Sequence, residues 1–394
     1  MRFRLTSFVL LLCTLAACQS PSVRQNTLPP ANPSAGDGAA QRCAAHANDT
    51  VDKLEACITR ASLWRRLSAF QRIADEHPGT QGHGNRDTGT PGYAASVAYV
   101  ARLMRAAGYD VTIQRYRYRN AAAVASPDPG WTHRRIPIDR DWLAQARSDY
   151  DYNVIAESRF GDASRTVVVD AHLDSIYGAG MLDNASGSTT ILEIALNMAK
   201  TPTRNRLRYV WFGGEELGLL GSRYYTAHLT PAQLRRIVFD LDVDVTATPN
   251  FDILIADPKY ATKVKRFPKN VVPQSRIGND DFADYFKAAG VVSQPARFGN
   301  NGTDSFAFSL AGVPNSGILT QQDCCKHDWE VDRWGGFRGN YEGKLPGWNG
   351  GCVDYPHRWC DNLSNNDAFV LELASKAVAY VTLELANRKH FPGR

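Results

Sequence analysis

The apolar run Leu207–Phe212 ends in two glycines followed by two adjacent acids, Glu215 and Glu216. An uninterrupted apolar run is typical of a strand that is buried on both faces of a sheet. Two neighbouring carboxylates at the end of such a strand repel each other and resist burial unless cations offset their charge. The pair therefore indicates a metal ligand beside a proton carrier, whereas a solvated strand end with two surface glutamates is the alternative.

Strand-like and helix-like segments alternate along the chain. The expected strands are Asp110–Tyr118, Asn153–Ser158, Thr166–Asp170, Leu207–Phe212 and Ile237–Val245. The expected helices are Cys43–Glu76, Tyr93–Ala107, Ala185–Lys200, Ser222–His228 and Asp367–Asn387. This alternation predicts an α/β fold, namely a single doubly wound domain with a mostly parallel, mixed central sheet flanked by helices. In such sheets functional sites gather at the C-terminal ends of the strands.

A second strand end carries a histidine and two acids. His172 leaves the strand at Thr166–Asp170, and Asp174 follows two residues later, where its carboxylate is suited to hold the second ring nitrogen of a metal-bound histidine. Asp183 directly precedes the expected helix Ala185–Lys200. An isolated aspartate there is usually a helix N-cap, but the nearby histidine favours metal ligation.

A third strand end carries alternating acids, Asp240, Asp242 and Asp244, which point to one face of a strand. They do not form a calcium-binding EF-hand loop, because no glycine stands at its sixth position and Phe251 occupies its twelfth. A further histidine, His357, lies in a short loop between two cysteines.

Cysteine usage and the N-terminus indicate export. Arg2 and Arg4 precede the apolar run 8–15, and small residues precede Cys18, as in a bacterial lipoprotein signal at residues 1–17. Cys18 would carry the acyl chains that anchor the protein to a membrane, while an ordinary signal peptide is the alternative. Because Gln19 follows the cysteine, analogy with Gram-negative lipoproteins favours the outer membrane, facing the periplasm or the exterior.

Residues 18–42 are rich in Pro, Ser, Ala, Gly and Asn and are expected to form a flexible tether, so that residues 43–394 form the folded domain. The cysteines beyond the leader are even in number, which predicts disulfides, with Cys352–Cys360 as the favoured pair. The net charge is +5 with mixed signs, so nothing indicates a nucleic-acid partner. We expect a monomer.

Several segments together resemble the co-catalytic di-zinc aminopeptidases, the secreted bacterial leucyl type that shares a fold with glutaminyl cyclases. The matching segments are 172–174, 180–187, 211–222, 241–250, 302–314 and 357–365, in the order of that family. The resemblance implies a zinc-exopeptidase fold and a metal-dependent exopeptidase that acts on the N-terminal peptide bond of peptides and proteins.

The resemblance also implies a cofactor of two Zn²⁺ ions per chain and a role for each site residue. The implied ligands are His172 and Asp244 for one ion, Glu216 and His357 for the other, and Asp183 as the bridge. Glu215 would be the general base for a hydroxide that bridges the ions, and Asp174 would support His172. The aspartate chosen is Asp244 rather than Asp242, because it fits the family pattern Asp-x-x-x-x-Pro-Asn.

Two positions differ from many enzymes of this type. Pro356, and not a tyrosine, precedes His357, and no arginine precedes the run Thr303-Asp304-Ser305. An aromatic-rich segment at 326–351 could cap the pocket or pack elsewhere. Two alternative functions therefore remain: a single-zinc acyltransferase like glutaminyl cyclase, and a non-catalytic binding lipoprotein of the cell envelope.

Overall fold

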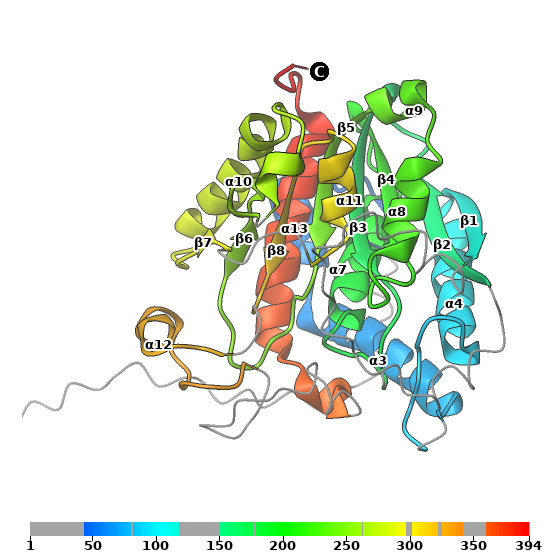
Figure 1. The fold of residues 1–394 in the computed structure, drawn as a ribbon, viewed down its shortest axis with the longest axis vertical. Helices are drawn as coiled ribbons and strands as arrows, with labels where there is room; N and C mark the ends of the chain where they lie inside the picture. Colours follow the sequence, from blue (N-terminus) through cyan, green and yellow to red (C-terminus); the bar gives the residue numbers. More distant parts are fainter. Residues whose placement is uncertain are drawn as a thin grey trace, which may run out of the picture. The chain divides into compact units, whose positions relative to one another are not determined.

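A mixed β-sheet forms the centre of the computed structural model (Figure 1), which describes residues 43–79, 82–117, 150–176, 178–261, 263–296, 302–321, 325–341 and 360–393. Its strands are β1 (Asp110–Arg117), β2 (Tyr150–Glu157), β3 (Asp162–His172), β4 (Asn205–Phe212), β5 (Ile237–Val243), β6 (Leu254–Ala256), β7 (Gln294–Pro295) and β8 (Asn315–Leu319). Their order is β1-β2-β4-β3-β5-β8-β6-β7, and the central strands β4, β3, β5 and β8 run parallel. The predicted mostly parallel, mixed sheet is confirmed.

Helices cover both faces of this sheet (Figure 1). The helices are α2 (Val51–Cys57), α3 (Arg60–Glu76), α4 (Pro91–Ala107), α7 (Ala185–Met198), α8 (Leu220–Ala227), α9 (Pro231–Arg236), α10 (Val271–Ala288), α11 (Ser305–Leu310), α12 (Asp328–Trp334) and α13 (Ala368–Asn387). On one face α3, α4, α7 and α13 enclose the larger hydrophobic core. On the other face a smaller core includes residues of α8 and α11.

Strand β3 shows why the sheet is buried on both faces. Val167 and Val169 belong to the larger core, whereas Val168, between them, belongs to the smaller one. Successive side chains of a strand point to opposite faces, so a strand that packs on both sides needs an uninterrupted apolar run. The same alternation sends the even-numbered residues Asp170 and His172 to the face of the smaller core.

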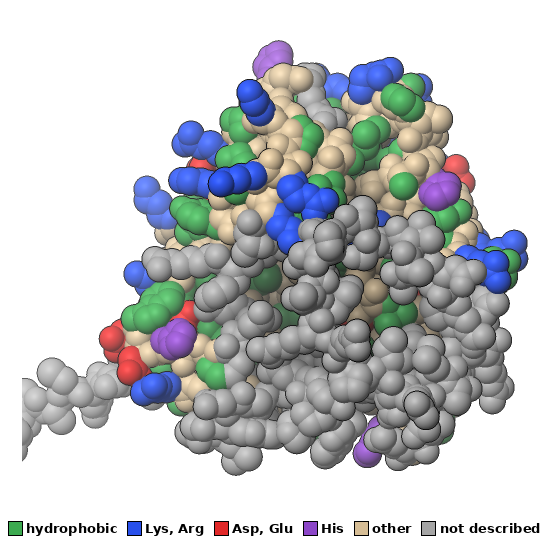
Figure 2. Space-filling model, viewed as in Figure 1, with side chains coloured by type: hydrophobic (Ala, Val, Ile, Leu, Met, Phe, Trp, Pro, Cys, Tyr) green, Lys and Arg blue, Asp and Glu red, His purple; other side chains and the backbone are tan. Residues whose placement is uncertain are grey.

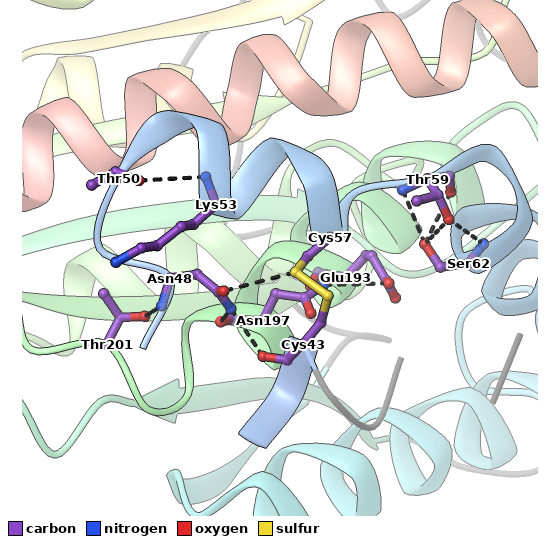
Figure 3. Close-up of a disulfide and its surroundings, with 10 residues drawn as sticks. All are labelled: Cys43, Asn48, Thr50, Lys53, Cys57, Thr59, Ser62, Glu193, Asn197 and Thr201. Atoms are coloured by element: carbon purple, nitrogen blue, oxygen red, sulfur yellow. Dashed lines mark hydrogen bonds between the residues drawn. A yellow bond between two sulfur atoms is a disulfide. The ribbon is translucent and has the colours of Figure 1, made fainter. Parts of the chain in front are cut away.

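The expected single helix Cys43–Glu76 is wrong, because the chain breaks between α2 and α3. Thr59 has an extended backbone, and its hydroxyl accepts a hydrogen bond of 3.1 Å from the backbone N–H of Ser62. A threonine in this role is the N-cap of a new helix. The helical spacing of apolar residues continues across this break and therefore does not reveal it. A disulfide joins Cys43 to Cys57 and closes the segment that precedes α3 (Figure 3).

The region after β5 contains elements that the sequence pattern did not indicate, among them β6, β8 and α10. Helix α10 contains Pro273 in its first turn and Gly278 in its interior. Both residues are poor signals for a helix, yet a proline in the first turn removes no intrahelical hydrogen bond. A side chain at position 278 would overlap Phe239 of β5, which explains the glycine by close helix–sheet packing.

Several basic side chains are exposed on the segment that leads into α10 and on its first half. Figure 2 shows Lys and Arg side chains over the part of the surface that carries α10. Lys259, Lys265, Lys269 and Arg276 are all exposed, and no acidic residue lies between positions 258 and 279. Among the described helices, none is long and apolar enough to cross a membrane.

Candidate active site

The C-terminal ends of three adjacent parallel strands bring the predicted site residues to one edge of the sheet. His172 is the last residue of β3, and Asp244 directly follows β5. Glu215 and Glu216 follow β4, which lies on the other side of β3. Neighbouring parallel strands end at the same edge of a sheet, so residues far apart in the sequence meet there.

His172, Asp183 and Asp244 converge on one point. Their potential ligand atoms all lie within 4.8 Å of one another. His172 Nε2 is 2.9 Å from Asp183 Oδ1 and 3.5 Å from Asp244 Oδ1. The histidine side chain is 1% exposed, whereas the side chains of Asp183 and Asp244 are 23% and 15% exposed. An imidazole and two carboxylates therefore face a common centre that is reached from solvent on the carboxylate side.

The start of α7 places Asp183 in this cluster. Asn184, and not Asp183, is the N-cap of α7, because its Oδ1 accepts a hydrogen bond of 2.8 Å from Gly187 N–H. Asn184 Nδ2 donates to the backbone oxygen of Val243 at 2.8 Å, which ties the helix start to the end of β5. The Asp183 side chain is thereby left out of helix capping and lies beside His172.

The second ring nitrogen of His172 lies against Asp174. Nδ1 is 3.1 Å from the backbone oxygen of Asp174 and 3.5 Å from its carboxylate Oδ1. The predicted support of His172 by Asp174 therefore comes first from the backbone. Burial lowers the pKa of His172, but Asp244 and the hydrogen bonds to Asp174 and Asp183 together raise it well above its ordinary value. A bound cation would offset the negative charge of the carboxylates that surround this imidazole.

Glu215 lies in a tight turn after β4. Its backbone oxygen accepts hydrogen bonds of 2.8 Å from the N–H groups of Gly218 and Leu219. Burial raises the pKa of Glu215 well above its ordinary value; His172 opposes this rise, and the charges of Glu216 and Asp244 add to it. Glu216 is half-buried in the same turn.

Further acids are buried behind the cluster, on the same face of the sheet. Asp170 pairs with Asp242 across β3 and β5, and Asp240 precedes them along β5. Asp242 does not turn toward His172. Its Oδ2 accepts hydrogen bonds from the Thr303 hydroxyl at 2.8 Å and the Ser305 N–H at 3.0 Å. Burial, with the charge of Asp244 second, raises the pKa of Asp242 to about 6. The geometry thus brings Asp244, rather than Asp242, to the imidazole.

Residues 325–341, the described part of the aromatic-rich segment, pack on the loop that follows Asp244. Asn250 Nδ2 donates to the backbone oxygens of Phe337 at 2.7 Å and Asn340 at 3.0 Å. The buried Lys326 Nζ donates to the Phe251 backbone oxygen at 2.6 Å and lies 3.4 Å from Asp252. This part of the segment is therefore fixed to the domain at the edge that carries the site.

His357, the fifth predicted ligand, lies outside the described residues. Cys352 also lies outside the described residues. Cys360 is disulfide-bonded, but the predicted pairing with Cys352 stays a prediction. Sequence reasoning missed two residues that hold the loop before Asp183, namely Arg86 and Asp361. Asp361 lies within the matching segment 357–365, whereas Arg86 lies in none of the matching segments. The roles of both depend on long-range contacts with the backbone, which no local pattern shows.

Comparisons with known proteins identify a family and several relatives of this chain. A family model described as peptidase family M28 matches residues 153–382. Leupeptin-inactivating enzyme 1 of Streptomyces exfoliatus is 29% identical over 82% of this chain and 61% of its own length. The probable lipoprotein aminopeptidase LpqL of Mycobacterium tuberculosis is 31% identical over 58% of this chain and 44% of its own length. The chain thus spans about half the length of these curated relatives.

Solved structures show the same fold at low sequence identity. A zinc aminopeptidase from Bacillus subtilis matches with a TM-score of 0.59 and 16% identity, over 84% of this chain and 96% of that structure. A Bacteroides thetaiotaomicron glutaminyl cyclase matches with a TM-score of 0.56 and 17% identity, over 84% of this chain and 99% of that structure. Both likenesses concern the fold alone.

Proposed function

Because the chain belongs to peptidase family M28, we propose that it is a zinc-dependent aminopeptidase that hydrolyses the N-terminal peptide bond of peptides and proteins. The observation that carries this proposal is the convergence of His172, Asp183 and Asp244. The charges of His172 and Asp244 also act on the buried Glu215. The aminopeptidase names among the relatives support the proposal, since LpqL is a probable aminopeptidase.

The donor set fits zinc. One imidazole nitrogen and carboxylate oxygens are ligands that Zn²⁺ accepts at about 2.0–2.2 Å. Three such atoms around one ion lie roughly 3–4 Å apart, close to the 2.9 and 3.5 Å seen here. We assign His172 and Asp244 to one ion, Glu216 and His357 to a second, and Asp183 to both. The absence of thiolate in this set leaves Co²⁺ or Mn²⁺ as usable substitutes.

The chemistry divides between the metal and Glu215. When bound, zinc would polarise the peptide carbonyl and lower the pKa of the attacking water. Glu215 would accept the proton of that water and return it to the amine that leaves. Asp174 holds the backbone of Glu215 in place through a hydrogen bond of 3.2 Å from the Glu215 N–H. His172, buried against Asp174, would keep a fixed ring orientation throughout.

The decisive experiment assays the purified chain on aminoacyl reporters and on N-blocked peptides, with added Zn²⁺ and with a chelator. We expect hydrolysis of free-amine substrates, its loss with chelator and its return with Zn²⁺. Hydrolysis of N-blocked peptides alone would overturn the aminopeptidase assignment. Zinc binding without turnover over a broad peptide panel would point instead to a binding lipoprotein.

A glutaminyl cyclase activity is the second candidate, because the fold also matches a solved glutaminyl cyclase. A cyclase of this kind would use a single zinc ion and release ammonia from N-terminal glutamine. Elemental analysis separates the two: two Zn²⁺ per chain supports the peptidase, whereas one Zn²⁺ with cyclisation of glutaminyl peptides supports the cyclase.

We also propose that the protein is anchored in the cell envelope by acyl chains on Cys18 and acts there as a monomer. The lipoprotein name of LpqL supports an envelope location. A Cys18→Ser variant should move from the membrane fraction to the soluble fraction. Membrane association that survives this substitution would contradict the lipid anchor.

A further inference from the structure

One carboxylate binds the backbone of the loop that carries Asp183. Asp361 Oδ1 accepts a hydrogen bond of 2.8 Å from the Leu182 N–H, and Oδ2 accepts one of 3.0 Å from the Asp183 N–H. Its backbone oxygen accepts a third, of 3.2 Å, from the Met181 N–H. Asp361 is 2% exposed, so these bonds do not compete with water. Three consecutive N–H groups are thus held by one residue 178 positions away.

An arginine binds the carbonyl groups of the same loop. Arg86 Nη1 donates to Leu173 O at 2.7 Å, Nε to Ala179 O at 2.7 Å, and Nη2 to Gly180 O at 2.8 Å. Arg86 is fully buried. Its planar guanidinium presents several donors in a fixed arrangement, which suits three carbonyls that converge from two ends of a loop.

The charge of Asp361 favours the charged form of Arg86. Burial lowers the pKa of Arg86 to about 10, and the charge of Asp361 is the foremost of the carboxylates that oppose this change. Arg86 is therefore charged at neutral pH. A buried arginine and a buried carboxylate are tolerated when each is hydrogen-bonded. Here the Arg86 side chain donates to three backbone oxygens of the loop, and the Asp361 carboxylate accepts from two of its N–H groups and from Asn365 Nδ2 at 3.2 Å.

This arrangement does more than satisfy polar groups. A carboxylate that accepts from two consecutive N–H groups fixes the orientation of the peptide between them, here the one that joins Leu182 to Asp183. The direction of the Asp183 side chain follows from that peptide. Groups that orient metal ligands in this way influence metal affinity by about 10- to 100-fold.

We propose that Asp361 and Arg86 are positioning residues, which fix Leu173 and residues 179–183 so that the Asp183 carboxylate faces His172 and Asp244. The proposal rests on the function proposed above for the cluster. Asp361 also directly follows the disulfide-bonded Cys360 and lies four residues after His357 in the sequence. It therefore links the segment of the fifth predicted ligand to the loop of the proposed bridging ligand.

The test compares Asp361→Asn and Arg86→Lys with matched controls in the full-length chain. Asn at 361 keeps the size but replaces one acceptor oxygen by a donor, and Lys at 86 keeps the charge but loses the three-carbonyl contact. The controls are Asp281→Asn, which loses a partly buried carboxylate that binds Arg388, and Arg208→Lys, which loses a guanidinium that binds Glu157. Both control positions lie outside the proposed site.

We expect zinc affinity, measured by competition with a chromophoric chelator, to fall about 10- to 100-fold in Asp361→Asn and Arg86→Lys. The Co²⁺ absorption spectrum should change in both, and hydrogen exchange at the Leu182 and Asp183 amides should accelerate in Asp361→Asn. The controls should lower the melting temperature at most, with zinc affinity within twofold of the wild type. If Asp361→Asn does not fold, Arg86→Lys decides.

Zinc affinity and kcat within twofold of the wild type in both site variants, despite faster amide exchange, would overturn the proposal and leave these residues a purely structural role. A failure of the proposed function would give a different result in the wild-type chain. A wild-type chain that binds zinc but hydrolyses no peptide loses the aminopeptidase assignment, while the ratio of zinc affinities still tests the positioning role. A wild-type chain that binds no zinc contradicts both.

Discussion

The backbone N–H of Glu215 donates a hydrogen bond of 3.2 Å to Oδ1 of Asp174. The other carboxylate oxygen of Asp174 accepts a bond of 3.0 Å from the Thr88 hydroxyl, and its backbone oxygen lies 3.1 Å from His172 Nδ1. Asp174 therefore joins the end of β3 to the turn after β4. The proposed base and the proposed zinc ligand His172 therefore share one buried support.

Glu215→Gln should abolish most peptidase activity and leave zinc bound. The amide cannot accept a proton from water, and the loss of a general base lowers kcat by about 10²- to 10⁴-fold. The backbone bond to Asp174 is unaffected, so the turn should persist. Steady-state kinetics with elemental analysis checks this outcome, and Glu193→Gln, at a buried acid on α7 that pairs with Arg66, is the control. Activity near the wild-type level with zinc in place would sink the assigned role.

Asp240→Asn should flatten the pH dependence of stability. Burial, followed by the charges of Asp242 and Asp304, raises the pKa of Asp240 well above its ordinary value. A carboxyl whose pKa is raised by folding stabilises the protein fully below its unfolded-state pKa of about 4, and this contribution is lost as the pH rises toward the folded-state pKa. The free energy of unfolding of the wild type should therefore fall as the pH rises above about 4. The free energy of unfolding of the variant should fall less steeply over the same range.

Urea unfolding of the chelator-treated chain between about pH 5 and 8 measures these slopes. Asp110→Asn, at an exposed position on β1, should keep the wild-type slope. Parallel slopes for Asp240→Asn and the wild type would show that Asp240 does not take up its proton on folding.

Gly187→Ala should destabilise the start of α7. A Cβ at this position would overlap the backbone oxygen of Val243 and the side chain of the N-cap Asn184. Since both atoms belong to the contact between α7 and β5, neither can move cheaply, and overpacking of this kind costs about 1–3 kcal/mol. Thermal and urea unfolding should show the loss. Gly302→Ala is the control, because no heavy atom lies within 4 Å of its Cβ, and an equal effect of both substitutions would refute the packing argument.

Replacing both Cys43 and Cys57 with serine should lower the free energy of unfolding by about 3 kcal/mol, the value expected for a closed loop of roughly 15 residues. The disulfide spans a sequence separation of 14 residues. Within the loop Asn48 donates from Nδ2 to the Asn197 backbone oxygen at 2.6 Å, so the loop is also fixed to α7 (Figure 3). Denaturant unfolding of the double variant gives the measurement. A loss well below 1 kcal/mol would mean that the contacts of Asn48 alone hold this segment.

Much of the fold could be predicted because its signals are local. The apolar runs of β3, β4 and β5 and the helical spacing of α4 and α13 identify these elements within a few residues. Helix α4 even ends as expected, with Gly108 in the left-handed region at φ 97°. The break before α3 was not predicted, because it depends on a single threonine hydroxyl. Helix α10 was not predicted either, because it depends on close packing against β5.

The candidate site divides in the same way. The sequence by itself determined which residue types are present and that His172, Glu215 and Asp244 leave strands, because a strand end shows in the apolar pattern. Only the tertiary structure decided that β4, β3 and β5 lie side by side, so that these ends meet. It alone shows that Asp242 turns to Thr303, and that Asp361 and Arg86 hold the loop before Asp183. Such contacts join backbone groups to residues far away in the chain, and no local pattern records them.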